Sequence, residues 1–326
     1  MLALVTGASG FVGSHLCGLL RREGHAVRAL VRPGRVPENL AGLDVEIVRG
    51  ELTAPETLPA AVQGVDWVFH LAAALKGFRE EDLARVNVGG TRALVEACLA
   101  APAPPRRFVH VSSLAAGGPS PAGGAPRPAG APDAPLTWYG RTKLEGEKVV
   151  AAAERLTSVI CRPAVVFGPR ERDVLQYFQI ARRGFLPVLG RRDRHYSLVY
   201  GPDLALALLR AAQTETPRAA VYDVASPEVV TWRELGLAIA AALGKKARVV
   251  RLPEWVAPPA GAVADLFARI AGKPQIFSSQ KVVEMRAPAW VADTAPAARD
   301  LGFVAPTPLA AALAETAAWY REHGWL

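Results

Sequence analysis

Short apolar runs alternate with amphipathic stretches through the first half of the chain. The apolar runs are rich in Val and Ile and predict strands at residues 2–5, 26–31, 45–48, 65–71, 107–111 and 158–166. The amphipathic stretches predict helices at residues 13–23, 89–100, 139–156, 173–183 and 232–243. Fully apolar strands that alternate with helices are typical of a parallel sheet covered on both faces. The pattern therefore predicts an α/β fold with a doubly wound parallel sheet.

Beyond about residue 170 the pattern changes to helices interrupted by Pro and Gly. Residues 221–224 predict one more strand that returns to the sheet, whereas residues 250–310 carry many prolines and short helical pieces. We therefore expect residues 1–168 with about 195–226 to form the sheet domain. Residues from about 169 to 194 and 227 to 326 would form a smaller, mostly helical C-terminal lobe.

A Gly-, Pro- and Ala-rich stretch occupies residues 117–135. Such a sequence cannot bury a helix face, so we expect a mobile loop. It directly precedes the segment with the clearest catalytic pattern. The sequence leaves open whether the loop is an active-site flap or a surface insertion.

Composition excludes several classes of protein. A length of 326 residues with 51% hydrophobic and 21% charged residues fits a globular protein of two lobes. The N-terminus has no signal-peptide pattern, and residues 204–209 end at Arg210, far short of the ~18 apolar residues of a membrane span. Cys17, Cys98 and Cys161 are widely separated in apolar contexts. We expect a cytoplasmic protein with reduced thiols, no metal site and no membrane insertion.

The formal net charge is +8, and seven Lys among 38 basic residues leave 31 Arg. A basic surface invites a nucleic-acid hypothesis. The chain has no zinc-finger spacing, basic heptad region or aromatic RNA-binding signature. We therefore expect no nucleic-acid partner.

A glycine-rich motif, TGASGFVG at residues 6–13, follows the first strand and opens the first helix. Gly7 permits a tight turn, Gly10 lets the backbone approach a pyrophosphate, and Gly13 allows close helix–strand packing. Free amides at the helix N-terminus would face the phosphates. The motif in this context predicts a Rossmann-type dinucleotide site at Gly7, Ser9, Gly10, Phe11, Val12 and Gly13.

The end of the second strand bears on the choice of cofactor. NAD-selective sites place an acidic side chain there, but residues 27–32 read VRALVR. A guanidinium can hold a 2′-phosphate with two hydrogen bonds. The sequence therefore favours NADP(H), with Arg32 as the stronger contact and Arg28 as the second, and leaves NAD(H) open.

A catalytic pattern begins at Tyr139. Tyr139 and Lys143 are four residues apart on a predicted helix, so their polar ends can converge. The ordinary pKa of a phenol is about 10, and a neighbouring ammonium lowers it. Ser113 follows the fifth strand and would hydrogen-bond the substrate oxygen. We expect Tyr139 to exchange a proton with an alcohol or carbonyl while the cofactor carries the hydride.

Together these motifs resemble the extended short-chain dehydrogenase/reductase superfamily, in its NAD-dependent epimerase/dehydratase branch. Further matching segments are residues 69–73 (FHLAA), 87–91 (NVGGT), 162–169 (RPAVVFGP), 202–205 (PDLA) and 222–224 (YDV). The resemblance implies that Ser113, Tyr139 and Lys143 are catalytic, and that Lys143 also binds the nicotinamide ribose. It further implies cofactor contacts from Glu51, Leu52, Leu71, Ala72, Ala73, Asn87, Val111, Pro163, Val165 and Val166. It also implies a homodimer, formed through the helices at 89–100 and 139–156.

Departures from the family pattern bear on the reaction. Leu114 and Ala115 stand where the family's dehydratases place an Asp-Glu pair, so elimination is not expected. Many of its epimerases carry Asn where this chain has Ala164 or Val165. The second strand is similar to that of dihydroflavonol-reductase and 3β-hydroxysteroid-dehydrogenase relatives. An apolar pocket could be lined by Trp255, Phe267, Ile270, Phe277 and Trp290.

The leading hypothesis is an NADP(H)-dependent oxidoreductase that interconverts a ketone or aldehyde and an alcohol on a small, largely apolar substrate. One alternative is a nucleotide-sugar epimerase with tightly bound NAD, whose anionic substrate could be bound by several arginines. They are Arg170, Arg172, Arg182, Arg183, Arg191, Arg192 and Arg194. Another alternative is a non-catalytic NAD(P)-binding scaffold or sensor.

Overall fold

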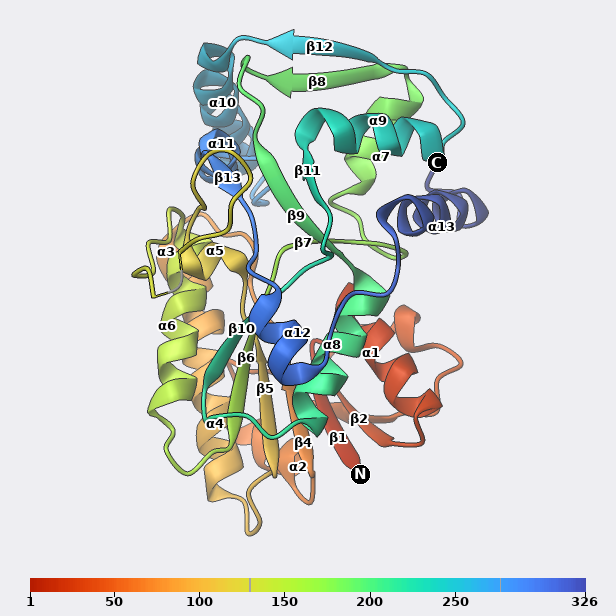
Figure 1. Cartoon of the computed structure of the whole chain (residues 1–326). Coiled ribbons are helices and arrows are strands. Elements are labelled where there is room, and N and C mark those ends of the chain that lie inside the picture. The colour runs from red at the N-terminus through yellow and green to blue at the C-terminus, as the bar shows by residue number, and fades with distance from the viewer. Residues whose placement is uncertain (129, 276) are drawn as a thin grey trace.

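A seven-stranded sheet in which every neighbouring pair is parallel forms the centre of the larger part of the molecule (Figure 1). The computed structural model describes residues 1–128, 130–275 and 277–326. The strand order is β10-β6-β5-β4-β1-β2-β3. The strands are β1 (Leu2–Thr6), β2 (Ala26–Val31), β3 (Glu46–Arg49), β4 (Trp67–His70), β5 (Arg107–Val111), β6 (Ser158–Pro163) and β10 (Ala220–Val224). The order reverses between β1 and β4, which creates the crevice where doubly wound sheets bind ligands. The predicted fold class is confirmed.

Helices cover both faces of this sheet. Helices α1 (Phe11–Arg22), α8 (Gly201–Gln213) and α12 (Ala295–Leu301) pack on one face, and α2 (Leu58–Val62), α4 (Thr91–Ala100) and α6 (Trp138–Ala152) pack on the other. Adjacent residues of β5 show why the strands are continuously apolar. Phe108 belongs to one core cluster and Val109 to the other, and both are fully buried.

The predicted strand at residues 158–166 is two strands. Strand β6 ends at Pro163, which has no amide hydrogen to donate, and β7 (Val165–Phe167) leaves the main sheet to pair with β9 (His195–Tyr200). Strand β9 also pairs with β11 (Val229–Thr231) and β13 (Ala289–Trp290). Strands β8 (Phe185–Leu189) and β12 (Arg248–Leu252) form a separate parallel pair. The C-terminal lobe is therefore less purely helical than expected.

The remaining helices complete the lobe and the loops. They are α3 (Glu80–Ala84), α5 (Leu114–Gly117), α7 (Leu175–Arg182), α9 (Trp232–Ala242), α10 (Ala257–Ile270), α11 (Ser279–Arg286) and α13 (Leu309–Glu322), with short turns at Glu38–Leu40, Pro55–Thr57 and Glu254–Val256 and a π-helix at Arg85–Gly90. Helices α7, α9 and α13 share one hydrophobic core with β8 and β9. Among the described residues, no helix is long and apolar enough to span a membrane.

The three cysteines are buried free thiols. Burial raises the pKa of Cys17, Cys98 and Cys161 to about 12 in each case. Because the thiolate is the reactive form, these side chains are chemically inert packing groups.

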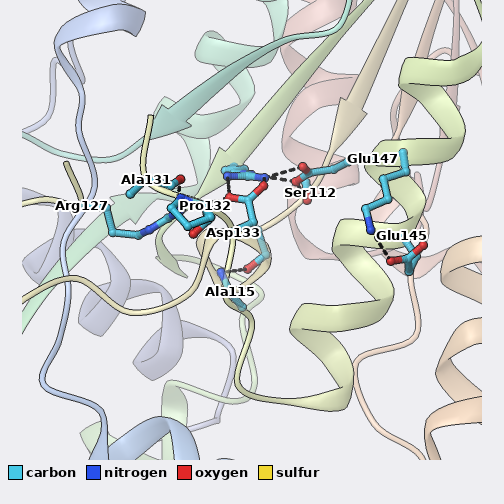
Figure 2. Close-up of polar contacts among 11 residues, drawn as sticks. Ser112, Ala115, Arg127, Ala131, Pro132, Asp133, Glu145 and Glu147 are labelled. Atoms are coloured by element: carbon cyan, nitrogen blue, oxygen red, sulfur yellow. Dashed lines mark hydrogen bonds and ion pairs between the residues drawn. The ribbon is translucent and has the colours of Figure 1, made fainter. Parts of the chain in front are cut away.

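Arg162 on β6 connects helix α6 to the Gly/Pro-rich loop. Figure 2 shows its two partners, Glu147 of α6 and Asp133 of the loop. Its guanidinium donates to Glu147 of α6 at 2.8 and 2.6 Å, and to Asp133 of the loop at 2.9 and 2.8 Å. The hydroxyl of Ser112, at the end of β5, donates to the same Glu147 carboxylate. One buried cluster thus joins a strand end, a helix and the loop.

The loop at residues 117–135 has further attachments. Arg127 donates to Asp133 at 3.2 Å and to two carbonyl oxygens of the loop at 2.7 and 2.8 Å. At the other end, the Ser120 amide donates to the carbonyl of Ala289 at 3.0 Å. Ala129 lies outside the described residues. The described part of the loop has no apolar face of its own and is attached to the rest of the chain by these polar contacts, and its mobility stays a prediction.

Gly13 tests the packing of α1 against β1. A Cβ atom at Gly13 would lie 2.2 Å from the carbonyl oxygen of Gly7, so the Gly13→Ala variant must push the turn apart. We expect a loss of about 1–3 kcal/mol in unfolding free energy, measured by denaturant unfolding. The control is Gly89→Ala, where the nearest atom to the new Cβ is 3.9 Å away. Equal stability of the two variants would contradict this account of the turn.

Asp133 tests the attachment of the loop. Burial alone would raise the pKa of Asp133, but the hydrogen bonds and charges of Arg162 and Arg127 outweigh it and lower the pKa. The Asp133→Asn variant should therefore open the loop more often and raise its cleavage by elastase about tenfold.

The exposed Glu145–Lys148 pair drawn in the same view supplies the control for this test (Figure 2). Glu145→Gln removes a solvent-exposed ion pair, so it should leave the cleavage rate unchanged. Equal cleavage of Asp133→Asn and wild type would show that Asp133 does not hold the loop.

Candidate active site

A cavity of about 1970 Å³ runs along the carboxyl ends of the central strands and continues into the C-terminal lobe. Its walls include the ends of β1, β2, β4, β5 and β6 on one side and residues of α7, α10 and α11 on the other. This is where a doubly wound sheet places a nucleotide, with the substrate between the two lobes.

The glycine turn forms a close-fitting cradle at one end of the cavity. Gly7 has φ of +69°, and a Cβ there would lie 2.9 Å from the amide nitrogen of Ala72. A Cβ at Gly10 would lie 3.1 Å from the Gly7 carbonyl oxygen. Helix α1 starts at Phe11 with no acidic residue in its first turn, so its free amides can receive an anion. The cradle fits the pyrophosphate of a dinucleotide.

Most of the predicted cofactor residues line this cavity. They are Gly7, Ser9, Gly10, Phe11, Val12, Gly13, Arg32, Glu51, Leu52, Leu71, Ala72, Ala73, Val111, Pro163, Val165 and Val166, and Ser113, Tyr139 and Lys143 line it as well. None of the described residues of the 117–135 loop lines the cavity, so the structure gives no support to the flap hypothesis.

Arg28 is not at the cavity, which corrects the second of the two arginine predictions. Its guanidinium donates to Glu46 at 2.9 Å and to the carbonyl oxygens of Ala61 and Gln63 at 3.1 and 2.7 Å. Arg28 lies in the middle of β2, so its side chain points across the sheet rather than beyond the strand's carboxyl end.

Asn87 also takes a different role from the predicted cofactor contact. It is 2% exposed and exchanges two hydrogen bonds with the backbone of Ala74, at 2.7 and 2.9 Å. Its amide also donates to the Thr142 hydroxyl at 3.0 Å. Asn87 therefore holds the cavity wall after β4 against α6 and does not itself line the cavity.

The turn after β2 is held by residues that sequence reasoning missed. The guanidinium of Arg49 donates to the carbonyl oxygens of Arg32 and Arg35, at 3.3 and 2.8 Å. Arg35 and Asn39 line the cavity together with Arg32, and the Asn39 amide donates to the Ser9 carbonyl at 3.0 Å. Arg35 was visible in the sequence as a second arginine three residues beyond Arg32.

Ser113, Tyr139 and Lys143 meet at the end of β5. Thr137 caps α6 and places Tyr139 in its first turn. The phenol of Tyr139 lies close enough to the side chain of Ser113 for the serine to lower the phenol pKa. The buried ammonium of Lys143 donates to the carbonyl oxygen of Val111 at 2.7 Å.

Burial controls the protonation of this group. It raises the pKa of Tyr139 to about 12, with a smaller lowering by the hydrogen bond to Ser113 and a further raise from the charge of Glu284. Burial lowers the pKa of Lys143 to about 8 against the attraction of Glu147. The expected lowering of the phenol pKa by Lys143 is not met, because desolvation dominates and the ammonium faces Val111. The phenol is therefore a proton donor near neutral pH.

Aromatic side chains line the substrate end of the cavity. Trp232 packs against Tyr177 and Tyr196, with ring centroids 4.6 and 5.7 Å apart. Trp290 is buried and donates its indole hydrogen to the Glu284 carbonyl at 3.0 Å. These rings offer an apolar surface, and charged side chains such as Lys281 and Glu284 line the cavity as well.

Helix α11, which lines the cavity, is hydrogen-bonded to the start of helix α6. The Thr137 hydroxyl donates to the Glu284 carboxylate at 3.3 Å, and the Trp138 amide donates to the Gln280 side chain at 3.0 Å. Glu284 also pairs with Lys281 at 2.9 Å. No local sequence signal could reveal these contacts, since the partners are separated by more than 140 residues.

The predicted apolar lining is correct only in part. Phe277 and Trp290 line the cavity, whereas Trp255, Phe267 and Ile270 are 74%, 65% and 74% exposed. The last three side chains point outward from η4 (Glu254–Val256) and α10.

Three of the seven arginines proposed for an anionic substrate have contacts with other groups of the protein. Arg170 donates to Ser14 at 3.0 Å, and the Arg172 guanidinium lies 4.6 Å from the centre of the Trp325 ring. Arg194 donates to the Leu189 carbonyl and to Glu254, at 2.9 and 2.8 Å. The cavity is lined by four arginines of this segment, which are Arg170, Arg172, Arg192 and Arg194.

Comparisons with known proteins agree with this geometry. The ceramide reductase of Caulobacter vibrioides is 33% identical over 323 residues, covering 99% of this chain and 95% of the relative. The 2-alkyl-3-oxoalkanoate reductase of Stenotrophomonas maltophilia is 30% identical over 327 residues, covering 93% and 94%. The solved structure of MoeE5 in complex with UDP-glucuronic acid and NAD is similar at a TM-score of 0.75 and 26% identity, covering 99% of this chain and all of that chain.

The family is shown directly by the sequence of the sheet domain. Residues 3–225 match the NAD dependent epimerase/dehydratase family. This range contains the glycine cradle and the Ser113, Tyr139 and Lys143 group. The chain therefore belongs to the NAD dependent epimerase/dehydratase family, and it is an NAD(P)-dependent oxidoreductase of that family.

Proposed function

We propose that the protein is an NADP(H)-dependent reductase that converts a ketone on a largely apolar, lipid-like substrate into a secondary alcohol. The observation that carries this proposal is that Ser113, Tyr139 and Lys143 line one cavity, with the Tyr139 phenol beside the Ser113 side chain. A protonated phenol can give a proton to a carbonyl oxygen but cannot take one from an alcohol.

The side chains divide the work around one oxygen atom. The Ser113 hydroxyl orients the ketone oxygen by a hydrogen bond, and Tyr139 donates its proton to that oxygen as the carbon is reduced. Bound NADPH supplies the hydride. Lys143, whose ammonium donates to the Val111 carbonyl, binds the ribose of the nicotinamide nucleotide.

The substrate class is supported by the cavity and by the relatives. The Tyr177, Tyr196 and Trp232 rings provide an apolar wall beside the Ser113–Tyr139 pair. Relatives named for ceramide and for 2-alkyl-3-oxoalkanoate substrates cover nearly the whole chain. The molecules in both names have a polar group and an apolar chain. The polar group would lie near Ser113 and Tyr139, and the apolar chain near the aromatic side chains of the cavity.

Two rival functions predict different behaviour. A nucleotide-sugar epimerase would purify with NAD that does not exchange, and a scaffold or sensor would bind cofactor without turnover on any carbonyl. Release of the cofactor after each turnover would exclude the first, and the complete Ser113, Tyr139 and Lys143 group counts against the second.

The proposal includes the predicted homodimer and the predicted organisation of the chain into a sheet domain and a C-terminal lobe. Helices α4 and α6 pack against each other on one face of the sheet and are the elements through which a homodimer would form. The cofactor would be bound by the sheet domain and the substrate by the C-terminal lobe.

Tyr139→Phe tests the proton donor. The variant should lose at least about 100-fold in kcat for ketone reduction, because it removes the proton but keeps the ring. Binding of NADPH, followed by fluorescence titration, should change little. Tyr177→Phe is the matched control, since it removes a phenol from the same cavity and should keep most of the activity. Wild-type turnover by Tyr139→Phe would end the proposal.

Arg32→Gln tests the choice of cofactor. Loss of a guanidinium that binds the 2′-phosphate should weaken NADPH binding by at least about tenfold, or about 1.4 kcal/mol, and leave NADH binding unchanged. The matched control is Arg28→Gln, whose side chain lies away from the cavity. If wild type binds NADH more tightly than NADPH, the NADP(H) assignment is wrong.

The pH dependence tests the role of Lys143. Burial lowers its pKa to about 8, so the ammonium is present below that pH and is lost above it. The value of kcat/KM for NADPH, which reports ionisations of the free enzyme, should be flat below about pH 8 and fall above it. Lys143→Arg keeps its charge and should remove the fall. A wild-type profile that stays flat to about pH 10 would contradict this role.

A further inference from the structure

The outer face of α10 carries a stripe of exposed apolar side chains. Val263, Leu266, Phe267 and Ile270 are 51%, 58%, 65% and 74% exposed. Their spacing of i, i+3, i+4 and i+7 places them on one side of the helix. Trp255, in the turn that precedes α10, is 74% exposed and extends the set. We call these five residues the apolar stripe.

The inner face of α10 is made of small residues. Ala257, Gly261 and Ala268 are its buried positions. A Cβ at Gly261 would lie 2.9 Å from the side chain of Val282 on α11, so the two helices pack closely there. The helix thus turns its small residues inward and its large apolar residues toward solvent. This is the reverse of an ordinary surface helix and marks an interaction surface.

The stripe adjoins the opening of the active-site cavity. Ala260, Ala268 and Arg269 of α10 line the cavity, and so do Lys273 and Phe277 just beyond the helix. In Figure 1, α10 lies at the end of the molecule remote from the N-terminus, next to the β8–β12 pair. A molecule bound along the stripe would therefore be next to the entrance of the substrate end.

Basic side chains border the stripe. Arg269 and Lys273 are exposed at the C-terminal end of α10. At the other end, basic groups surround Glu254, the neighbour of Trp255. The hydrogen bond with Arg194 lowers the pKa of the Glu254 carboxyl group most, and the charges of Arg286 and Arg192 lower it further. An apolar face bordered by cations fits the boundary between anionic headgroups and acyl chains.

We propose that the apolar stripe docks the protein on an anionic phospholipid bilayer, with the stripe side chains in the interfacial layer. The 14 residues of α10 span about 21 Å, too little to cross a hydrocarbon core of ~30 Å, so the helix lies on the membrane. Docking would let a lipid-like substrate enter the cavity without crossing water. This last step rests on the proposed function, whereas the docking itself does not.

A second copy of the chain fits the stripe less well than a bilayer. A two-fold contact would bring the same patch of each copy together, with Arg269 and Lys273 facing basic groups of the same patch. The repulsion between these charges opposes such a contact, whereas anionic lipid attracts them.

Vesicle flotation of the full-length protein tests the proposal. The protein should float with vesicles of phosphatidylcholine and phosphatidylglycerol and much less with phosphatidylcholine alone. Ile270→Asp should weaken binding to the anionic vesicles at least about tenfold, and Phe267→Asp with Ile270→Asp should abolish it. The matched control is Val304→Asp, which places the same charge at a 61% exposed valine outside the stripe and should bind like wild type.

Two further readouts separate docking from catalysis. Trp255 is the one exposed tryptophan among the described residues, so brominated lipids should quench wild-type fluorescence more than that of Trp255→Phe. Reduction of a short, water-soluble ketone should be unaffected by the stripe variants, because none of them lines the cavity.

Failure of wild type to bind anionic vesicles would overturn the docking proposal and leave the proposed reaction untouched. Equal binding by Ile270→Asp and Val304→Asp would also overturn it. So would a change of oligomeric state in the stripe variants without any vesicle binding, which would make the stripe a subunit interface. If wild type does not reduce the short ketone, the result would instead count against the proposed reaction.

Discussion

The buried ion pair between Arg162 and Glu147 is the interaction on which the active-site geometry depends. Glu147 lies one helical turn beyond Lys143 on α6, and its carboxylate also receives the hydroxyl of Ser112, the neighbour of Ser113. One carboxylate thus sets the position of the catalytic helix relative to the ends of β5 and β6. Burying such charges costs several kcal/mol per ion unless geometry compensates. Here Arg162 donates twice to Glu147 and twice to Asp133.

The same burial shifts the pKa values of the two titratable side chains of the site. Desolvation raises the pKa of Tyr139 to about 12 and lowers that of Lys143 to about 8, so a neutral phenol stands near an ammonium at neutral pH. The protonated phenol is the form that the proposed reduction requires. The rings of Tyr177, Tyr196 and Trp232 pack together in the wall of the same cavity and give it an apolar surface.

Local patterns predicted the parts of the site that depend on nearby residues. The turn at Gly7 and Gly13, the i, i+4 spacing of Tyr139 and Lys143, and the strand end at Ser113 are set by backbone geometry, which the sequence displays. The predictions failed where long-range packing decides. Arg28 lies on the predicted strand, but its guanidinium pairs with Glu46 and does not line the cavity. Asn87 donates to Thr142 and does not line the cavity either. Hydrophobicity alone could not show that Phe267 and Ile270 face solvent, because a helical stripe looks the same whether it covers a core or an outer surface.

Transfer of deuterium from NADPH dideuterated at C4 to a long-chain 3-oxo lipid tests the central claim most directly. The account predicts an alcohol that carries deuterium on its carbinol carbon, formed together with an equal amount of released NADP⁺. It also predicts that the alcohol oxygen takes its proton through Tyr139, so Tyr139→Phe should form almost no labelled product. A bound nicotinamide cofactor that is not released and keeps its deuterium through turnover would contradict the account. So would the failure of every ketone to form an alcohol although NADPH binds.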